Sequence, residues 1–148
     1  MKALIQRVSR ASVSIGSEVV GSIGKGLAVL VGVVNGDTLE DVKYLAGKTV
    51  NLRIFEDEQG KFNLSLLDIK GELLVVSQFT LAADCRRGRR PSFTDAAAPD
   101  IAEDLISNFV SEAGKLGVKT ATGRFRSHML VEIHNDGPVT IMLDSAEK

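Results

Sequence analysis

The stretch GLAVLVGVV, residues 26–34, is an almost unbroken apolar run in a chain of 148 residues. A strand that is buried on both faces has this composition, whereas a half-exposed strand alternates apolar and polar residues. A second run, ELLVVSQFTL at residues 72–81, has the same character. The two runs therefore predict buried strands at the centre of the fold.

After each of the two apolar runs, the chain contains a segment whose apolar residues recur at helical spacing, so we expect two helices. The first helix is expected within residues 37–55, where Thr38 and Asp41 have the spacing of a capping pair. Residues recur there at helical spacing: Leu39, Val42, Leu45 or Ala46, and Thr49. The second helix is expected within residues 98–117, with Pro99 near its first turn and Gly117 at its end. Its apolar face repeats every four residues: Ile101, Leu105, Phe109 and Ala113.

The remaining segments favour strands. Residues 3–15 alternate at strand period near their end, residues 61–84 are predicted to be strand, and two or three more strands close the chain. No repeat, linker or low-complexity tract divides residues 1–148, so we expect a single domain. The fold class is α/β: a β-rich domain of roughly eight strands in sheet or barrel-like layers, with two helices packed on one side.

Composition excludes several classes of protein. Hydrophobic content of 44% and charged content of 25% are typical of a soluble globular protein. No apolar run is long enough to span a bilayer and no signal-peptide pattern is present, so we expect a cytoplasmic location. The single cysteine, Cys85, excludes an internal disulfide. His128 and His134 lack metal-ligand spacing, and we expect neither a metal nor another cofactor.

Positive charge is concentrated in one place although the net charge is −1. Within CRRGRRPSF, residues 85–93, four arginines occur without an intervening acid: Arg86, Arg87, Arg89 and Arg90. Such a cluster can bind phosphate groups. The alternative is an ordinary solvated loop.

A polar segment interrupts the last apolar region. NDGPVT, residues 135–140, has the composition of a hairpin turn between two strands. Pro138 removes a backbone donor where the second strand would begin, and a Gly-Pro junction allows a cis peptide at a cost of only about 1 kcal/mol. The pair Gly137-Pro138 therefore either only forms a turn or adopts a particular conformation that serves the function of the protein.

Ser77, Gln78 and Thr80 lie at the end of the second apolar run, and polar side chains at the end of a buried strand often form a site. The alternative is local hydrogen bonding as the strand ends. A hydroxyl nucleophile needs a nearby base, and His134 could supply it only if the fold brought it close. G-x-S-x-G, P-loop and G-x-G-x-x-G motifs are absent, which argues against lipases, NTPases and dinucleotide enzymes.

LLVVSQFTL followed by RRPSF, together with NDGPVT near the end of the chain, resembles the D-aminoacyl-tRNA deacylase family, also called D-tyrosyl-tRNA deacylase. The resemblance extends from ALIQRVSRASV through TGRF, residues 122–125, to the last strand. It implies one deacylase domain over residues 1–148 and a homodimer with its site at the subunit interface. The substrate would be aminoacyl-tRNA, with no membrane and no metal involved.

The resemblance also implies a mechanism. The family hydrolyses the ester between a D-amino acid and the 3′-terminal adenosine of tRNA and spares the L-aminoacyl ester. A cis Gly137-Pro138 would enter the partner's site and reject L-residues by its backbone, so many D-residues and glycine should be substrates. Backbone N–H groups at Gln78, Phe79 and Thr80 would stabilise the oxyanion, with help from the ribose 2′-hydroxyl. The competing mechanism makes Thr80 a covalent nucleophile.

Other residues carry two interpretations each. Ser77 and Gln78 shape the adenosine pocket or bond locally at the strand end. Phe79 lines the pocket or packs in the core, and Met129 walls the site or packs in the core. Arg7 braces the Gly137-Pro138 loop or lies at the surface. Two rival functions remain open: an RNA-binding module without catalysis, and a small serine-type hydrolase of ordinary esters.

Overall fold

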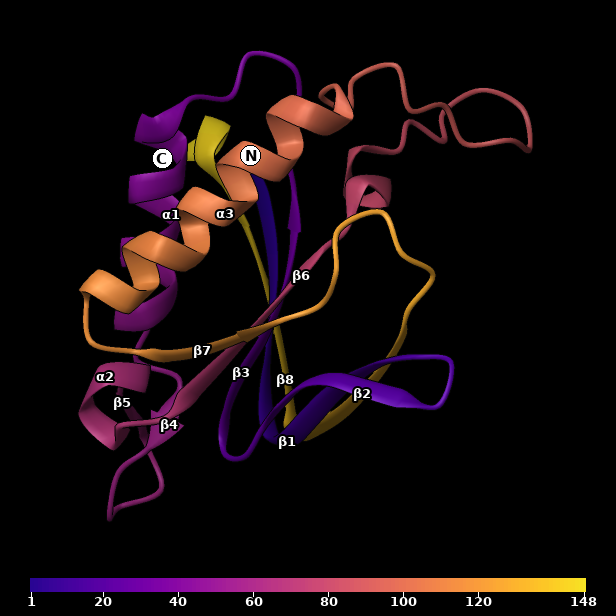
Figure 1. The fold of residues 1–148 in the computed structure, drawn as a ribbon. Helices are drawn as coiled ribbons and strands as arrows, with labels where there is room; N and C mark the ends of the chain where they lie inside the picture. Colours follow the sequence, from indigo (N-terminus) through magenta and orange to yellow (C-terminus); the bar gives the residue numbers. More distant parts are fainter.

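The structure, a computed structural model, describes residues 1–148 and is built on one six-stranded sheet (Figure 1). Five strands follow one another in the order β2-β1-β3-β6-β7, and β8 pairs with the other edge of β1. The strands β3, β6 and β7 are parallel, and the other pairs are antiparallel. The strands span Lys2–Ile15 (β1), Glu18–Ile23 (β2), Gly26–Gly32 (β3), Glu72–Ser77 (β6), Lys119–Thr122 (β7) and Leu130–Asp144 (β8). A small separate pair joins β4 (Phe55–Glu56) to β5 (Phe62–Leu64).

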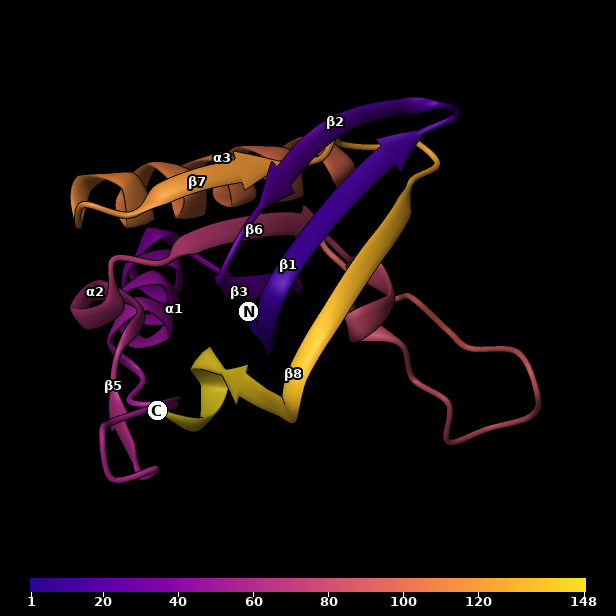
Figure 2. The same cartoon turned by 90° about the horizontal axis from the view of Figure 1, so that it is seen from below.

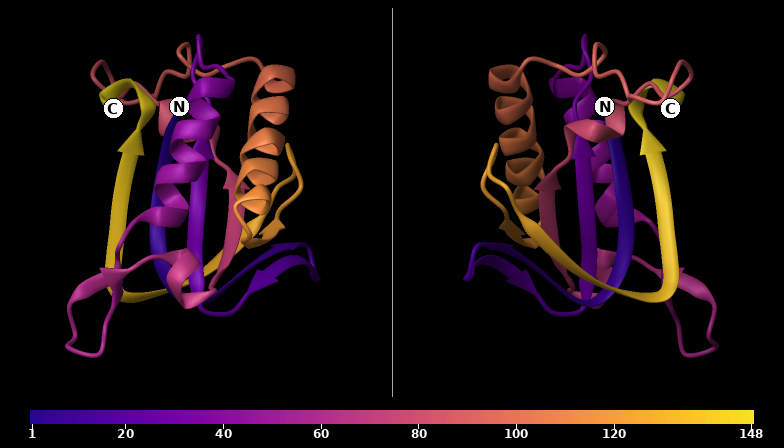
Figure 3. Two further views of the ribbon diagram at one scale, coloured as in Figure 1. Left: turned by 90° about the vertical axis from the view of Figure 1, so that its left-hand side faces the viewer. Right: turned by 90° about the vertical axis from the view of Figure 1, so that its right-hand side faces the viewer.

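Two long helices cover one face of the sheet, as expected (Figure 3). They are α1 (Leu39–Asn51) and α3 (Pro99–Lys115), and they pack against each other. The Asp41 carboxylate accepts a hydrogen bond from the N–H of Thr38 at 2.8 Å, which confirms the predicted capping pair. Pro99 opens α3, also as predicted. None of the helices is both long and apolar enough to cross a membrane.

One part of the predicted apolar face of α3 is wrong. Leu105, Phe109 and Ala113 are buried, but Ile101 is exposed and Ala102 is buried in its place. A spacing of four residues drifts by about 40° per step on a helix of 3.6 residues per turn. Ile101 lies eight residues before Phe109, so its side chain is rotated about 80° away from that of Phe109 around the helix axis. Ala102 lies seven residues before Phe109 and is rotated by only about 20°, so it stays on the buried side.

Both faces of the central strands are buried, as the apolar runs predict. The larger core lies under the helices and the smaller one on the opposite face. The smaller cluster contains Val8, Ala11, Val13, Ile23, Ala28, Leu74 and Val76. On that face β2 curls towards β7, and a Cβ at Gly21 would collide with the Thr122 carbonyl oxygen. The sheet is thus nearly closed, and the predicted α/β class with barrel-like layers is confirmed.

Residues 61–84 contain less strand than predicted. Ser65 and Asp68 cap a short helix, α2 (Leu66–Ile69): the Ser65 hydroxyl accepts from the N–H of Asp68, and the Asp68 carboxylate accepts from the N–H of Ser65. The apolar run at residues 72–81 is a strand only as far as Ser77. Its neighbour β3 ends at Gly32, and without a partner the chain turns into a 3-10 helix, Phe79–Ala82. A second 3-10 helix, Ser145–Glu147, ends the fold.

The predicted hairpin at residues 135–140 is wrong. Both flanking segments belong to one strand, β8, and both pair with β1: Asn135 lies opposite Val8 and Thr140 opposite Gln6. Residues 136–139 therefore face Arg7 alone and form a bulge, here called the Gly-Pro bulge. Pro138 is tolerated because β8 is an edge strand and needs no ladder hydrogen bond there. The Gly137-Pro138 peptide bond is cis, and β8 is sharply bent along its length (Figure 2).

Candidate active site

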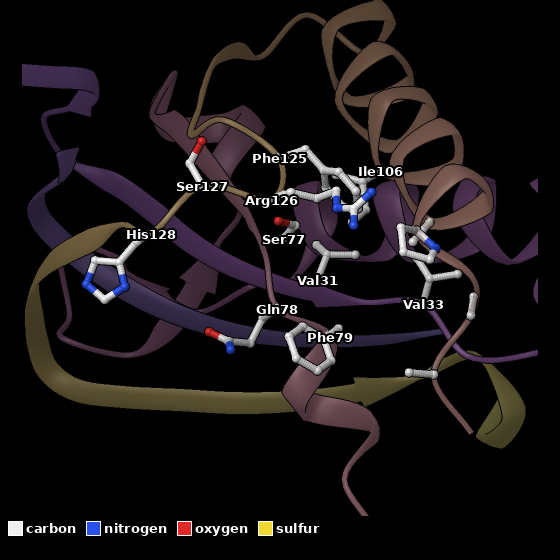
Figure 4. A pocket seen from close by; sticks show the side chains of 14 residues that line it. Val31, Val33, Ser77, Gln78, Phe79, Ile106, Phe125, Arg126, Ser127 and His128 are labelled. Atoms are coloured by element: carbon white, nitrogen blue, oxygen red, sulfur yellow. The ribbon is translucent and has the colours of Figure 1, made fainter. Parts of the chain in front are cut away.

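A cavity of about 520 Å³ opens where the parallel strands β3 and β6 end (Figure 4). We call it the strand-end cavity. Its floor comes from the strand ends, one wall from α3 and the segment before it, and the rim from the loop between β7 and β8. Its lining comprises Val31, Val33, Ser77, Gln78, Phe79, Ala96, Ala97, Pro99, Ala102, Ile106, Phe125, Arg126, Ser127 and His128. The strand end that sequence analysis selected thus lies at a genuine cavity.

Three of the four predicted catalytic residues line this cavity, and one does not. Ser77, Gln78 and Phe79 belong to it, whereas Thr80 is exposed outside it. The Thr80 hydroxyl is hydrogen-bonded by the side-chain amide of Gln78. The backbone N–H of Gln78 donates to the Val31 carbonyl at 2.8 Å, so it is already satisfied. Phe79 and Thr80 begin the 3-10 helix, a position whose N–H groups have no intrahelical acceptor.

Phe79 and Met129 have opposite environments. Phe79 is 57% exposed and meets the ring of Phe93 edge to face at 5.0 Å between centroids, so the alternative that it packs in the core is wrong. Met129 packs against the smaller core and is absent from the cavity lining, in agreement with its core interpretation.

The histidine near the predicted site is His128, not His134. His134 lies opposite Arg10 on β8 and lines a separate small cavity, so the fold does not bring it to Ser77. His128 lines the strand-end cavity together with Ser77, but neither side chain takes part in a hydrogen bond. The rim from Phe125 to His128 went unrecognised in the sequence because it reaches the cavity from a distant loop and carries no local motif.

The four clustered arginines lie on an exposed loop that extends away from the sheet (Figure 2). Arg86 is paired with Asp84 at 2.7 Å, and hydrogen bonds from its guanidinium hold the pKa of the Asp84 carboxyl well below its usual value. No acid is paired with Arg87, Arg89 or Arg90. Arg86 borders a second cavity, of about 510 Å³, rather than the strand-end cavity. The loop thus offers three uncompensated positive charges to solvent.

Arg7 braces the Gly-Pro bulge. It is 7% exposed, so the surface interpretation is wrong. Its Nε donates to the Asp136 carbonyl at 2.9 Å and its Nη1 to the Ile54 carbonyl at 2.8 Å. The Phe62 ring lies 5.4 Å from its guanidinium. One buried cation therefore ties the bulge to the β4–β5 pair.

Asn135 holds the bulge from its own strand. Its side-chain oxygen accepts from the N–H of Val139 at 2.9 Å, and its amide donates to the Thr140 hydroxyl at 2.8 Å. Gly137 and Pro138 themselves remain exposed. The backbone of the bulge is thus held by hydrogen bonds from Arg7 and Asn135, while Gly137 and Pro138 at its tip face solvent.

The bulge and the strand-end cavity lie at opposite ends of the sheet. Gly137 projects near Arg7, which pairs with Leu27 of β3, and Ser77 lies at the far end of β6. Strand spacings and rises place the two roughly 15–20 Å apart within one chain. The bulge cannot enter the cavity of its own chain.

No group of three or more His, Cys, Asp or Glu side chains is placed to hold a metal ion. What the cavity offers is an apolar wall with a few polar groups at its edge, the usual make-up of a small-molecule pocket. Fold and cavity together define the class: a mixed α/β protein with an enzyme-type pocket at the carboxyl ends of parallel strands.

Comparisons with known proteins give the family. The family model described as D-Tyr-tRNA(Tyr) deacylase matches residues 4–144. A relative from Roseiflexus sp. (strain RS-1), named D-aminoacyl-tRNA deacylase, is 62% identical over 146 residues, which is 99% of this chain and 94% of the relative. The chain belongs to the D-aminoacyl-tRNA deacylase family and is, as a member, a hydrolase acting on ester bonds.

Two solved structures share the fold. One, described as c-Myc DNA Unwinding Element Binding Protein, is 41% identical with a TM-score of 0.93, covering 97% of this chain and 98% of that chain. The other, described as a probable eukaryotic D-amino acid tRNA deacylase, is 17% identical with a TM-score of 0.82, covering 96% and 97%. At that identity the second likeness concerns the fold alone.

Proposed function

We propose that residues 1–148 form a single deacylase domain that hydrolyses the ester between a D-amino acid, or glycine, and the 3′-terminal adenosine of tRNA. The observation that carries this proposal is the 62% identity, over nearly the whole chain, to a relative named D-aminoacyl-tRNA deacylase. The strand-end cavity is suited to the terminal aminoacyl-adenosine because it combines apolar walls with polar groups at one edge. We place the protein in the cytoplasm, without a cofactor.

Selection for the D-form is proposed to be steric. With the adenosine, the ester carbonyl and the α-amino group held, one remaining direction at the α-carbon carries hydrogen in a D-residue and the side chain in an L-residue. A rigid main-chain wall at Gly137 and Pro138 would admit only hydrogen in that direction. Backbone makes a suitable wall because it does not read the identity of the amino acid. Glycine has no side chain to exclude and is accepted for the same reason.

The wall has to come from a second copy of the chain, so the active form is proposed to be a homodimer. Support comes from the separation of bulge and cavity within one chain and from the exposed bulge tip. The outer edge of β8 is unpaired and carries two exposed apolar side chains, Leu130 at 68% and Met142 at 50%. In a twofold dimer, each chain would lend its bulge to the cavity of the other.

Catalysis is proposed to need only oxyanion stabilisation and a positioned water. The available donors are the N–H groups of Phe79 and Thr80, since that of Gln78 is bonded to Val31. A donor of this kind contributes about 3–4 kcal/mol to the barrier reduction in comparable sites. Ser77 and the side chain of Gln78 shape the pocket, and the ribose 2′-hydroxyl positions the water. The exposed arginines Arg86, Arg87, Arg89 and Arg90 are proposed to contact tRNA.

The competing mechanism gives Thr80 the role of nucleophile. Its hydroxyl lies outside the cavity lining, and no His or Lys is hydrogen-bonded to it. Thr80→Ala should therefore keep near-normal turnover, and loss of activity with unchanged folding would revive the nucleophile. A tRNA ending in 2′-deoxyadenosine tests whether the ribose 2′-hydroxyl takes part in catalysis. Full activity on this tRNA would exclude that role.

One assay tests the function: purified protein is incubated with matched D-, L- and glycyl-tRNA, and release of the amino acid is followed. The proposal expects loss of the D- and glycyl esters and survival of the L-ester. Equal loss of both mirror forms would contradict it. Labelling of Ser77 or Thr80 by an acylating probe would instead indicate a serine-type hydrolase.

A nucleic-acid-binding role without catalysis is the second candidate. It is favoured by the three unpaired arginines and by the 41% identical structure, because that protein is described as binding a DNA unwinding element. It predicts that tRNA is bound while every ester stays intact.

A further inference from the structure

Arg126 is the residue of the strand-end cavity whose backbone is least expected. It has φ +64°, in the left-handed region that glycine adopts freely and other residues rarely do. Only Lys70 shares this feature among the non-glycine residues, and Lys70 caps the short helix α2. Arg126 has no such capping role. Its conformation belongs to a turn, in which the N–H of Ser127 donates to the Arg124 carbonyl at 3.2 Å and Arg126 takes the third position, where a positive φ is common. This turn holds Arg126 at the rim of the cavity.

The guanidinium of Arg126 points across the cavity, towards the side of Ile106 (Figure 4). It forms no ion pair and no hydrogen bond. Arg124, two residues earlier, is by contrast paired with Glu18 at 3.1 Å and does not line the cavity. Arg126 is therefore an unpaired cation at the cavity, and the turn from Arg124 to Ser127 holds it there.

Arg126 is the one arginine or lysine side chain in the cavity lining. Among its lining residues only Arg126 and His128 are titratable, and no acid is present. An adjoining cavity is lined by one acid, Glu103 of α3, which is not paired with Arg126. An unpaired arginine in an acid-free pocket is suited to a phosphate or another anion, since its fork can donate two hydrogen bonds to one group.

We propose that Arg126 binds the phosphate on the 5′ side of the terminal adenosine, and so anchors the tRNA end while the ester lies at Phe79 and Thr80. This rests on the proposed function, which puts that adenosine in the strand-end cavity. The 5′-phosphate is the anion of the substrate nearest to the nucleoside itself. Arg126 is then a substrate-binding residue that sets affinity and takes no part in the bond-breaking step.

The test compares AMP with adenosine, which differ only by this phosphate. Calorimetry on the unmodified protein should show AMP binding about tenfold more tightly than adenosine, the contribution of one charge-assisted contact. Arg126→Gln should remove that difference and leave adenosine binding unchanged. Arg124→Gln is the matched control and should leave both affinities as they are. Equal binding of AMP and adenosine by the unmodified protein, or an undiminished preference in Arg126→Gln, would overturn the proposal.

A second variant separates binding from folding. Arg126→Gly relieves the left-handed strain and should be at least as stable to heat as the unmodified protein, yet lose the preference for AMP. If Arg126→Gly kept the preference, the phosphate contact would be refuted whatever its stability.

A third experiment measures turnover, and its result depends on the proposed function. With the 3′-D-tyrosyl ester of AMP, Arg126→Gln should raise KM about tenfold at unchanged kcat, and with the ester of adenosine neither constant should move. A change of kcat with both esters would give Arg126 a different role. If the unmodified protein hydrolysed neither ester nor D-tyrosyl-tRNA, the proposed function would fail, while the calorimetric comparison would still decide on Arg126.

Discussion

The strand-end cavity and the Gly-Pro bulge both arise where a strand is interrupted, with opposite results. At Ser77 the strand β6 loses its neighbour β3, and the chain turns away to leave a hollow. At Gly137 the strand β8 keeps its neighbour β1 and pushes its surplus residues outward. The end of β6 thus produces the strand-end cavity, and the surplus residues of β8 produce the Gly-Pro bulge.

On the proposed function, one chain holds two incomplete halves of a site. The cavity has room and, at Phe79 and Thr80, N–H groups without an intrahelical acceptor. The bulge has a fixed backbone held by Arg7 and Asn135, but neither Gly137 nor Pro138 lines the strand-end cavity of the same chain. On the proposed function, the two meet only across a pair of chains.

The most damaging single change is expected at Gly137. A Cβ there would lie 2.9 Å from the Val139 side chain and 3.0 Å from Arg7 Nη2, at φ +135°. Gly137→Ala should displace the wall and reduce D-aminoacyl-tRNA turnover by about a hundredfold, the loss seen when reacting groups are misplaced by about 1 Å. Gly60→Ala is the control, since Gly60 also has positive φ but open space around it. Comparable loss in both variants would point to general strain.

Arg7→Gln weakens the brace and leaves the bulge sequence intact. Two hydrogen bonds from a buried cation disappear, which should lower the free energy of unfolding by about 3 kcal/mol. The loosened wall should also begin to admit L-aminoacyl-tRNA. Chemical denaturation and the ratio of D to L turnover measure the two effects. Arg10→Gln, at an exposed position of the same strand, should change neither.

A smaller effect is expected on the arginine loop, outside both regions. Changing Arg87, Arg89 and Arg90 to Gln should raise KM for tRNA and reduce the slope of log(kcat/KM) against log salt by about 2, at about 0.7 per phosphate contact. Arg86→Gln should do less than any one of these, because Arg86 already serves Asp84. An unchanged salt slope in the triple variant would remove the loop from the tRNA interface.

The sequence predicted those parts that depend on local pattern. Apolar runs mark the two-sided burial of β3 and β6, and spacing with Thr38, Asp41 and Pro99 marks both long helices. The strand end at Ser77, which the sequence predicts to form part of a site, lines the strand-end cavity.

What was missed depends on partners distant in the chain. NDGPVT has hairpin composition, and only pairing of both flanks with β1 makes it a bulge. Arg7 is expected at the surface because arginine is charged, although strand alternation places it on the same side of β1 as the buried Ala3 and Ile5. It is tolerated there because the carbonyls of Asp136 and Ile54, both distant in the chain, accept its hydrogen bonds. Arg126 and His128 reach the rim of the cavity because the sheet is nearly closed. No local sequence pattern predicts that closure.

Subunit complementation tests the central claim most directly. Ala96→Trp fills the strand-end cavity and Gly137→Ala disables the bulge, so dimers of either variant alone should be nearly inactive. In a mixed dimer, the chain with the intact cavity receives the intact bulge of the other. Random mixing should therefore restore about a quarter of the normal activity towards D-aminoacyl-tRNA, because half of the dimers are mixed and each has one complete site. If mixed dimers form and stay inactive, the bulge does not complete the cavity of its neighbour.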